Sequence, residues 1–128
     1  MKPELTYLLS SVLLTFVQVL IAAAAANQVV GLNTLAGNRE DLPVLTGFAG
    51  RARRAHLNMI ENMVLFTALV LVTAVAGKAN AMTAMGALIF FWARLIYAVI
   101  YLLGIPWLRT LAWFVSVIGM VMIAWQLF

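Results

Sequence analysis

The 128-residue sequence contains no cysteine, a single histidine, and so few charged residues that they make up only 9% of the chain. The absence of cysteine excludes disulfides, thiolate metal sites and a protein thiol nucleophile. Because zinc and similar ions need several imidazole or thiolate ligands, we also expect no metal site. Any sulfur chemistry must therefore use a thiol that arrives with a substrate.

Apolar residues fill the chain instead: 66% of it is hydrophobic and the mean hydropathy is +1.07. This balance lies outside the range of soluble domains and predicts an integral membrane protein. Four apolar stretches each approach the roughly 20 residues that a helix needs to cross a bilayer. They are residues 5–26, 55–76, 81–103 and 110–128. We therefore predict one all-α membrane domain over residues 1–128, folded as an antiparallel four-helix bundle.

The basic residues lie in connections beside these spans, which is typical of membrane topology and not of nucleic-acid binding. On one side of the membrane are Arg39, Arg51, Arg53, Arg54 and Arg109, and on the other are Lys2 and Lys78. The positive-inside bias then places the long 31–54 loop in the cytoplasm and both termini outside. The short remaining loops favour a bacterial inner membrane.

Two of the predicted spans carry polar side chains on one helical face, at overlapping depths in the bilayer. These residues are Arg54, Asn58 and Glu61 on the second span and Arg94, Tyr97 and Tyr101 on the third. We expect the two sets to face each other across a shared hollow, with Arg94 pairing with Glu61 directly or through water. Ionisable residues within a membrane are functional candidates by default. The alternative is an ion pair with interhelical hydrogen bonds that only fixes helix register.

Arg109 follows Pro106 in the first turn of the fourth span, where the helix dipole is positive. A cation in that position indicates an anion in front of it. The alternative is an arginine that reaches the phosphate headgroups of the membrane.

The residue types indicate an amino-acid-like or peptide-like anion as the ligand. Arginines bind carboxylates with two hydrogen bonds, and Glu61 can accept from an ammonium group. The same positive field would lower the pKa of a thiol and generate thiolate at neutral pH. Phosphate is a competing anion, but no glycine-rich cradle precedes a helix. His56 lies off the polar face and we interpret it as structural or interfacial.

The segments "RRAHLNMIEN" (53–62) and "RLIYAVIY" (94–101), followed by Pro106 and Arg109, resemble the MAPEG superfamily. These are the membrane-associated proteins in eicosanoid and glutathione metabolism, and the microsomal glutathione transferases are the most similar group. The resemblance implies a homotrimer that binds glutathione between neighbouring subunits near the cytoplasmic face. It assigns glutathione binding to Arg54, Asn58, Glu61, Arg94, Tyr97 and Tyr101, and stabilisation of the thiolate to Arg109 and Tyr101.

The sequence departs from the family pattern at two positions. Val30 and Leu57 stand where members such as the prostaglandin E synthase have arginines. The resemblance therefore leaves two possibilities within this fold. The first is a membrane-bound glutathione transferase or glutathione-dependent peroxidase acting on lipophilic electrophiles, and the second is a non-catalytic membrane binding or scaffold protein.

A third possibility is a small four-span proton-coupled multidrug exporter. Such exporters are expected to carry an essential carboxylate in their first span. The first span predicted here carries only Gln18 as a comparable polar group.

Overall fold

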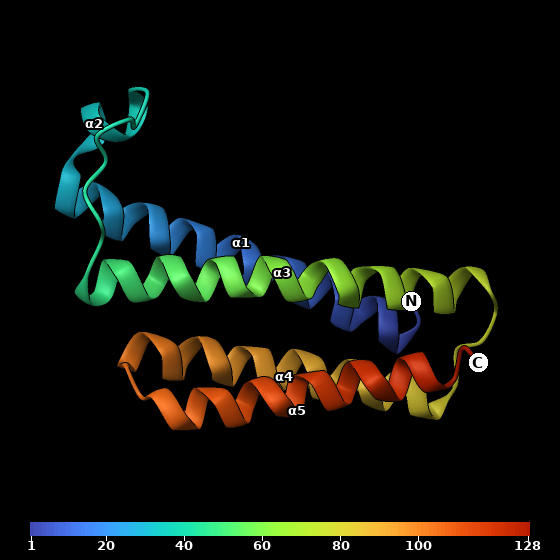
Figure 1. The fold of residues 1–128 in the computed structure, drawn as a ribbon. Coiled ribbons are helices and arrows are strands. Elements are labelled where there is room, and N and C mark those ends of the chain that lie inside the picture. Colours follow the sequence, from blue (N-terminus) through green and yellow to red (C-terminus); the bar gives the residue numbers. More distant parts are fainter.

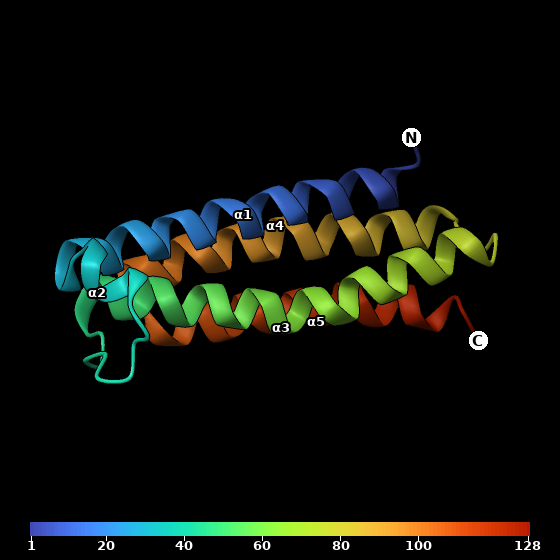
Figure 2. The same ribbon diagram turned by 90° about the horizontal axis from the view of Figure 1, so that it is seen from above.

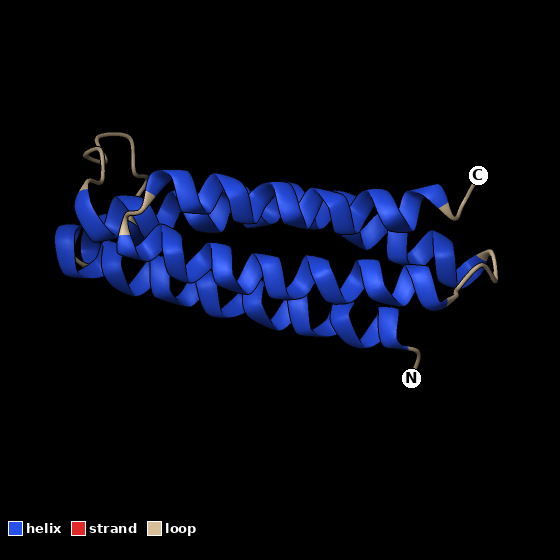
Figure 3. Cartoon of the chain, turned by 90° about the horizontal axis from the view of Figure 1, so that it is seen from below, coloured by secondary structure: helices blue, strands red, loops and turns tan.

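A computed structural model describes residues 1–128 as an all-helical protein without strands. The helices are α1 (Pro3–Val30), α2 (Leu32–Ala36), α3 (Gly47–Val75), α4 (Ala81–Leu103) and α5 (Pro106–Trp125). The four long helices lie side by side as one elongated bundle (Figure 1; Figure 3). Each of them is long and apolar enough to cross a membrane. This confirms the all-α class and the four membrane-capable helices.

The two ends of the bundle differ in what they carry. Both chain termini and the α3–α4 connection lie at one end, which we call the terminal end (Figures 1 and 2). The short helix α2 and the α4–α5 connection lie at the other. We call the latter the arginine end, because it holds the starts of α3 and α5. Its arginines are Arg51, Arg53, Arg54 and Arg109.

The helix bounds correct several of the predicted spans. Only α4 matches its prediction, while α1 runs four residues further, to Val30, and α5 begins at Pro106. The predicted 31–54 loop is wrong in its extent, because α3 already begins at Gly47. Arginine and alanine are good helix formers, so the polar segment before residue 55 continues the helix. Arg54 therefore lies about two turns inside α3 and not at its mouth.

Local sequence explains where α4 and α5 begin and end. The side chain of Asn80 accepts hydrogen bonds from the first turn of α4, and Thr83 accepts one from the Asn80 backbone in return. This reciprocal cap satisfies backbone donors that the helix itself leaves unpaired. Gly104 ends α4 with φ of 80°, a conformation that glycine adopts without strain. Pro106 then starts α5 at a position where its missing N–H costs nothing.

Close packing positions α4 against its neighbours. The rings of Phe66 on α3 and Phe90 on α4 are both fully buried and stack with centroids 3.8 Å apart. On the other side of α4, a Cβ atom added at Gly86 would lie only 2.5 Å from the carbonyl oxygen of Gly119 on α5. Small residues of this kind let membrane helices approach closely. The register of α4 against α3 and α5 is thereby set.

Candidate functional site

Polar side chains of α3 and α4 meet between the two helices toward the arginine end. Arg94 is fully buried, and its Nη2 donates a hydrogen bond of 2.7 Å to Oδ1 of Asn58. Closer to the end of the bundle, Nε of Arg54 donates to the hydroxyl of Tyr101 at 3.3 Å. The structure thus brings the polar faces of α3 and α4 together at two levels.

Two cation–π contacts connect these levels and add α5. The guanidinium carbon of Arg94 lies 4.1 Å from the ring centroid of Tyr97, and that of Arg109 lies 4.4 Å from the centroid of Tyr101. The two tyrosine rings contact edge to face at 5.6 Å. In such contacts the face of the aromatic ring attracts the positive charge of the guanidinium group. We call the connected group the Arg–Tyr cluster; it consists of Arg54, Asn58, Arg94, Tyr97, Tyr101 and Arg109.

Hydrogen-bond donors exceed acceptors in this cluster. Nε and Nη1 of Arg94 are buried and have no partner. A guanidinium offers only donors, and leaving a buried charged group unsatisfied costs more than the roughly 1–3 kcal/mol of a neutral one. The cluster holds three guanidinium groups but no carboxylate. This arrangement favours an anionic ligand with several acceptor oxygens.

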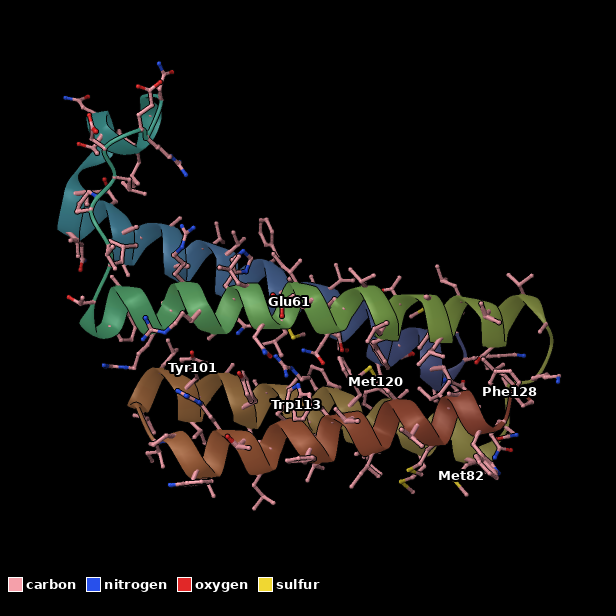
Figure 4. All side chains as sticks on the ribbon, in the orientation of Figure 1. Glu61, Met82, Tyr101, Trp113, Met120 and Phe128 are labelled. Carbon is pink, nitrogen blue, oxygen red and sulfur yellow. The ribbon has the colours of Figure 1, made fainter.

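Arg94 and Glu61 do not form the predicted pair by direct contact. Arg94 bonds to Asn58 instead, and Glu61 is exposed on the surface of α3. Figure 4 shows Glu61 on α3, separate from Tyr101 on α4 and Trp113 on α5. Glu61 follows Asn58 by three residues, which on a helix turns its side chain about 60° away from that of Asn58. That rotation is enough to move the carboxylate out of the α3–α4 contact.

The predicted hollow between the two polar faces is not one of the main grooves of the single chain. None of its five main grooves is lined by Arg94, Tyr97 or Tyr101. The two tyrosines are buried against Ala55 and Ala112, which fill the space between the helices. A ligand of this cluster therefore needs a further surface beside it.

Sequence reasoning missed two residues near the cluster. Asn62 donates to the backbone oxygen of Asn58 at 2.9 Å and to its Oδ1 at 3.2 Å, which orients the partner of Arg94. Asn62 lies four residues after Asn58, and side chains at this spacing are neighbours on a helix, so the sequence alone could have indicated the contact. Arg51, interpreted only as a topology signal, donates from Nε to the carbonyl of Leu102 at 3.1 Å. No pattern in the sequence indicated that contact.

Helix α1 contributes buried polar groups that were also missed or misplaced. Gln18 is buried and its Oε1 has no partner. Glu4 is buried as well and accepts a hydrogen bond from the hydroxyl of Thr83. The prediction that the first span carries only Gln18 is wrong, because α1 already begins at Pro3. The spacing of seven residues between Glu4, Ser11 and Gln18 was the signal for one buried face.

Comparison with known proteins gives one result. A family model described as the MAPEG family matches residues 5–128 of the chain. The match includes α3, α4 and α5, which carry the whole Arg–Tyr cluster. No curated protein matches the chain.

Proposed function

The chain belongs to the MAPEG family, and on that premise we propose that it is a membrane-bound glutathione transferase or glutathione-dependent peroxidase. Family membership supports an integral membrane protein of eicosanoid and glutathione metabolism. The finer assignment depends on one observation: Arg94 is fully buried, with Nε and Nη1 unpartnered and no carboxylate bound to it. In this proposal glutathione arrives from water and a lipophilic electrophile from the bilayer.

The polar groups fit the charges of glutathione. Glutathione carries carboxylates at both ends and one ammonium group. Arg54 and Arg94 offer guanidinium donors, which suit carboxylates, and Asn58 holds Arg94 in place. Glu61, exposed on α3, is the acceptor available to the ammonium group. Tyr97, stacked on Arg94, completes the set that we propose to bind the peptide.

Tyr101 and Arg109 are the residues that we propose to act on the thiol. Arg54 already donates to the Tyr101 oxygen, so the phenolic proton is free to point at sulfur. Arg109 lies over the same ring and adds positive charge. Together they favour the thiolate, whose proton passes to solvent. Sulfur then forms a bond to an electrophilic carbon, the bond from that carbon to its leaving group breaks, and the leaving group, a halide in the case of an aryl halide, departs as its anion.

The peroxidase reaction uses the same thiolate. Sulfur attacks the terminal oxygen of a lipid hydroperoxide, the O–O bond breaks, and the alcohol leaves after taking up a proton. A second glutathione then displaces hydroxide from the oxidised sulfur. The thiol proton of the second glutathione converts the departing hydroxide to water, so the products are glutathione disulfide, the lipid alcohol and water.

The position of Glu61 supports the proposed homotrimer of antiparallel four-helix subunits. Glu61 lies about 21 Å from the start of α3, and the whole helix is about 43 Å long. The residue is therefore near the middle of the helix, at a depth that lies within the hydrocarbon core. An exposed carboxylate at this depth is costly. A neighbouring copy over this face would offset the cost and supply the further surface that the cluster needs. The number of copies, and the cytoplasmic location of the arginine end, follow from the family resemblance and the positive-inside bias.

Replacing Arg109 with alanine tests the catalytic proposal. Turnover of glutathione with an aryl halide should fall about 100- to 1,000-fold, as for loss of one preorganised donor at a developing anion. Thermal stabilisation by glutathione should persist, at about 2.7 kcal/mol when its concentration is 100-fold its dissociation constant. Lys78→Ala is the control, because it removes the same charge at the terminal end.

A non-catalytic MAPEG-fold binding or scaffold protein is the alternative. It is favoured by the two apolar positions that stand where other members have arginines: Leu57 is exposed on α3, and Val30 packs against the buried cluster that includes Ala25 and Leu45. A wild-type protein that is stabilised by glutathione but inert with aryl halides and lipid hydroperoxides would establish this alternative.

A further inference from the structure

The end of α4 has a backbone carbonyl for which the helix itself provides no donor. In a continuous α-helix the carbonyl of Leu102 would accept from the N–H four residues later, but that residue is Pro106, which has none. The carbonyls of Ile100 and Tyr101, by contrast, both accept from the backbone N–H of Gly104. Leu102 therefore needs a donor from another part of the chain.

Arg51 of α3 supplies that donor. Its Nε donates to the Leu102 carbonyl at 3.1 Å. The same side chain lies over Gly104, because a Cβ atom added at that glycine would be 3.5 Å from both Cδ and Nε of Arg51. The positive charge also faces the negative end of the α4 dipole. Arg51 thus holds the α4–α5 turn against α3 by a charged hydrogen bond and by direct contact.

The turn that Arg51 holds carries the two residues proposed to act on the thiol. Tyr101 lies in the last turn of α4 and Arg109 in the first turn of α5, with a two-residue connection between the helices. The guanidinium carbon of Arg109 is 4.4 Å from the centroid of the Tyr101 ring. Arg54, three residues after Arg51 and on the same face of α3, donates to the Tyr101 hydroxyl. Two arginines of α3 therefore hold the last turn of α4, one by its backbone and one by its side chain.

We propose that Arg51 is a positioning residue for this site: by closing the α4–α5 turn, it keeps Arg109 in front of Tyr101. The inference rests on the proposed function, which assigns the thiol to these two residues. Nε of Arg51 is already bonded to the Leu102 carbonyl, so its effect reaches the thiol through the backbone of the turn. A displacement of about 1 Å in a group that acts on the reacting atom can cost about 100-fold in rate.

Arg51→Met tests the positioning, because methionine has a similar length but neither donor nor charge. Turnover of glutathione with an aryl halide should fall about 10- to 100-fold, while glutathione affinity measured by calorimetry changes less than about 2-fold. The pKa of bound glutathione, read from the ultraviolet absorbance of its thiolate, should rise toward the free thiol value of about 8.5. Unchanged turnover and an unchanged thiol pKa would overturn the inference.

Two further variants separate the hydrogen bond from the charge. In Arg51→Gln, the amide nitrogen is as many bonds from the backbone as Nε of arginine, so it can donate to Leu102 without a charge. This variant should recover most of the turnover lost in Arg51→Met. Arg53→Met is the matched control, since it removes an exposed charge that lies beside α1 and the connecting loop, and it should leave turnover unchanged. Equal losses in Arg51→Gln and Arg51→Met would show that only the charge matters, and the positioning role would fail.

Gly104→Ala disturbs the same turn and keeps every charge. Gly104 has φ of 80°, a conformation that strains alanine, although the added Cβ would make only ordinary contact with Arg51. Turnover should fall about 10-fold with glutathione affinity retained. Gly104→Asn tolerates this conformation better and should recover most of the loss. Full turnover in Gly104→Ala would contradict a role for the turn.

Hydrogen exchange distinguishes a failure of this inference from a failure of the proposed function. The amide of Gly104 should exchange about 10-fold faster in Arg51→Met than in the wild type or Arg53→Met, because the turn opens more easily. A wild-type protein without turnover would defeat the proposed function, and this exchange would still show whether Arg51 holds the turn. Equal exchange in all three proteins would overturn the inference even if the wild type were active.

Discussion

The two ends of the bundle differ in how completely their polar side chains are hydrogen-bonded within the chain. At the terminal end, Nδ2 of Asn80 donates to Oε1 of Gln126 at 2.9 Å, and Nζ of Lys78 donates to the carbonyl of Leu127 at 2.9 Å. The buried carboxylate there, Glu4, accepts from Thr83. The polar side chains that join the helices at this end thus find partners within the chain.

Toward the arginine end, buried hydrogen-bond donors outnumber the acceptors that the chain offers them. Arg94 is as deeply buried as any residue in the protein, yet only its Nη2 has a hydrogen-bond partner. Buried polar groups that are satisfied rigidify a fold, whereas unsatisfied ones destabilise it unless a ligand or partner completes them. The comparison therefore distinguishes the buried carboxylate of Glu4, which has a partner within the chain, from the buried guanidinium of Arg94, which keeps two donors without one.

Among the substitutions that test this comparison, Arg94→Met should have the largest effect. Glutathione affinity, measured by calorimetry, should fall at least about 30-fold, because loss of a buried charged donor costs at least about 2 kcal/mol. The free energy of unfolding should stay the same or rise, since an unpaired buried charge is replaced by an apolar side chain of similar length. A variant that unfolds in detergent would instead show that Arg94 is structural.

Thr83→Val should have the opposite effect. It leaves the carboxylate of Glu4 buried without its partner, also removes the Thr83 half of the α4 cap, and should lower the free energy of unfolding by about 1–3 kcal/mol. Glutathione-dependent turnover per folded protein should change less than 2-fold. Thr73→Val is the matched control, because that buried hydroxyl bonds only to the carbonyl of Leu69 in its own helix. A loss of turnover without a loss of stability would place the terminal end in the functional site.

Asn80→Ala should have the smallest effect. It removes the cap of α4 and should lower the free energy of unfolding by about 1 kcal/mol, measured by thermal unfolding in detergent. Asn80→Ser retains a capping oxygen and should recover most of that loss. If serine were no better than alanine, the contact with Gln126 and not the cap would be the stabilising interaction.

Much of the fold could be predicted because membrane helices must satisfy their own backbone and expose apolar side chains. Hydropathy alone placed α4 correctly, and the polar faces of α3 and α4 do meet. The start of α3 and the buried position of Glu4 were missed. Charged residues near a helix end look the same in sequence whether the helix continues through them or stops.

The amino-acid sequence by itself determined the number of membrane-capable helices and the polar faces on two of them, since both depend on hydropathy and helical period. Only the tertiary structure decided the partners within those faces. Arg94 bonds to Asn58 and not to Glu61 because helix rotation and close packing, and not sequence distance, select which side chain it reaches.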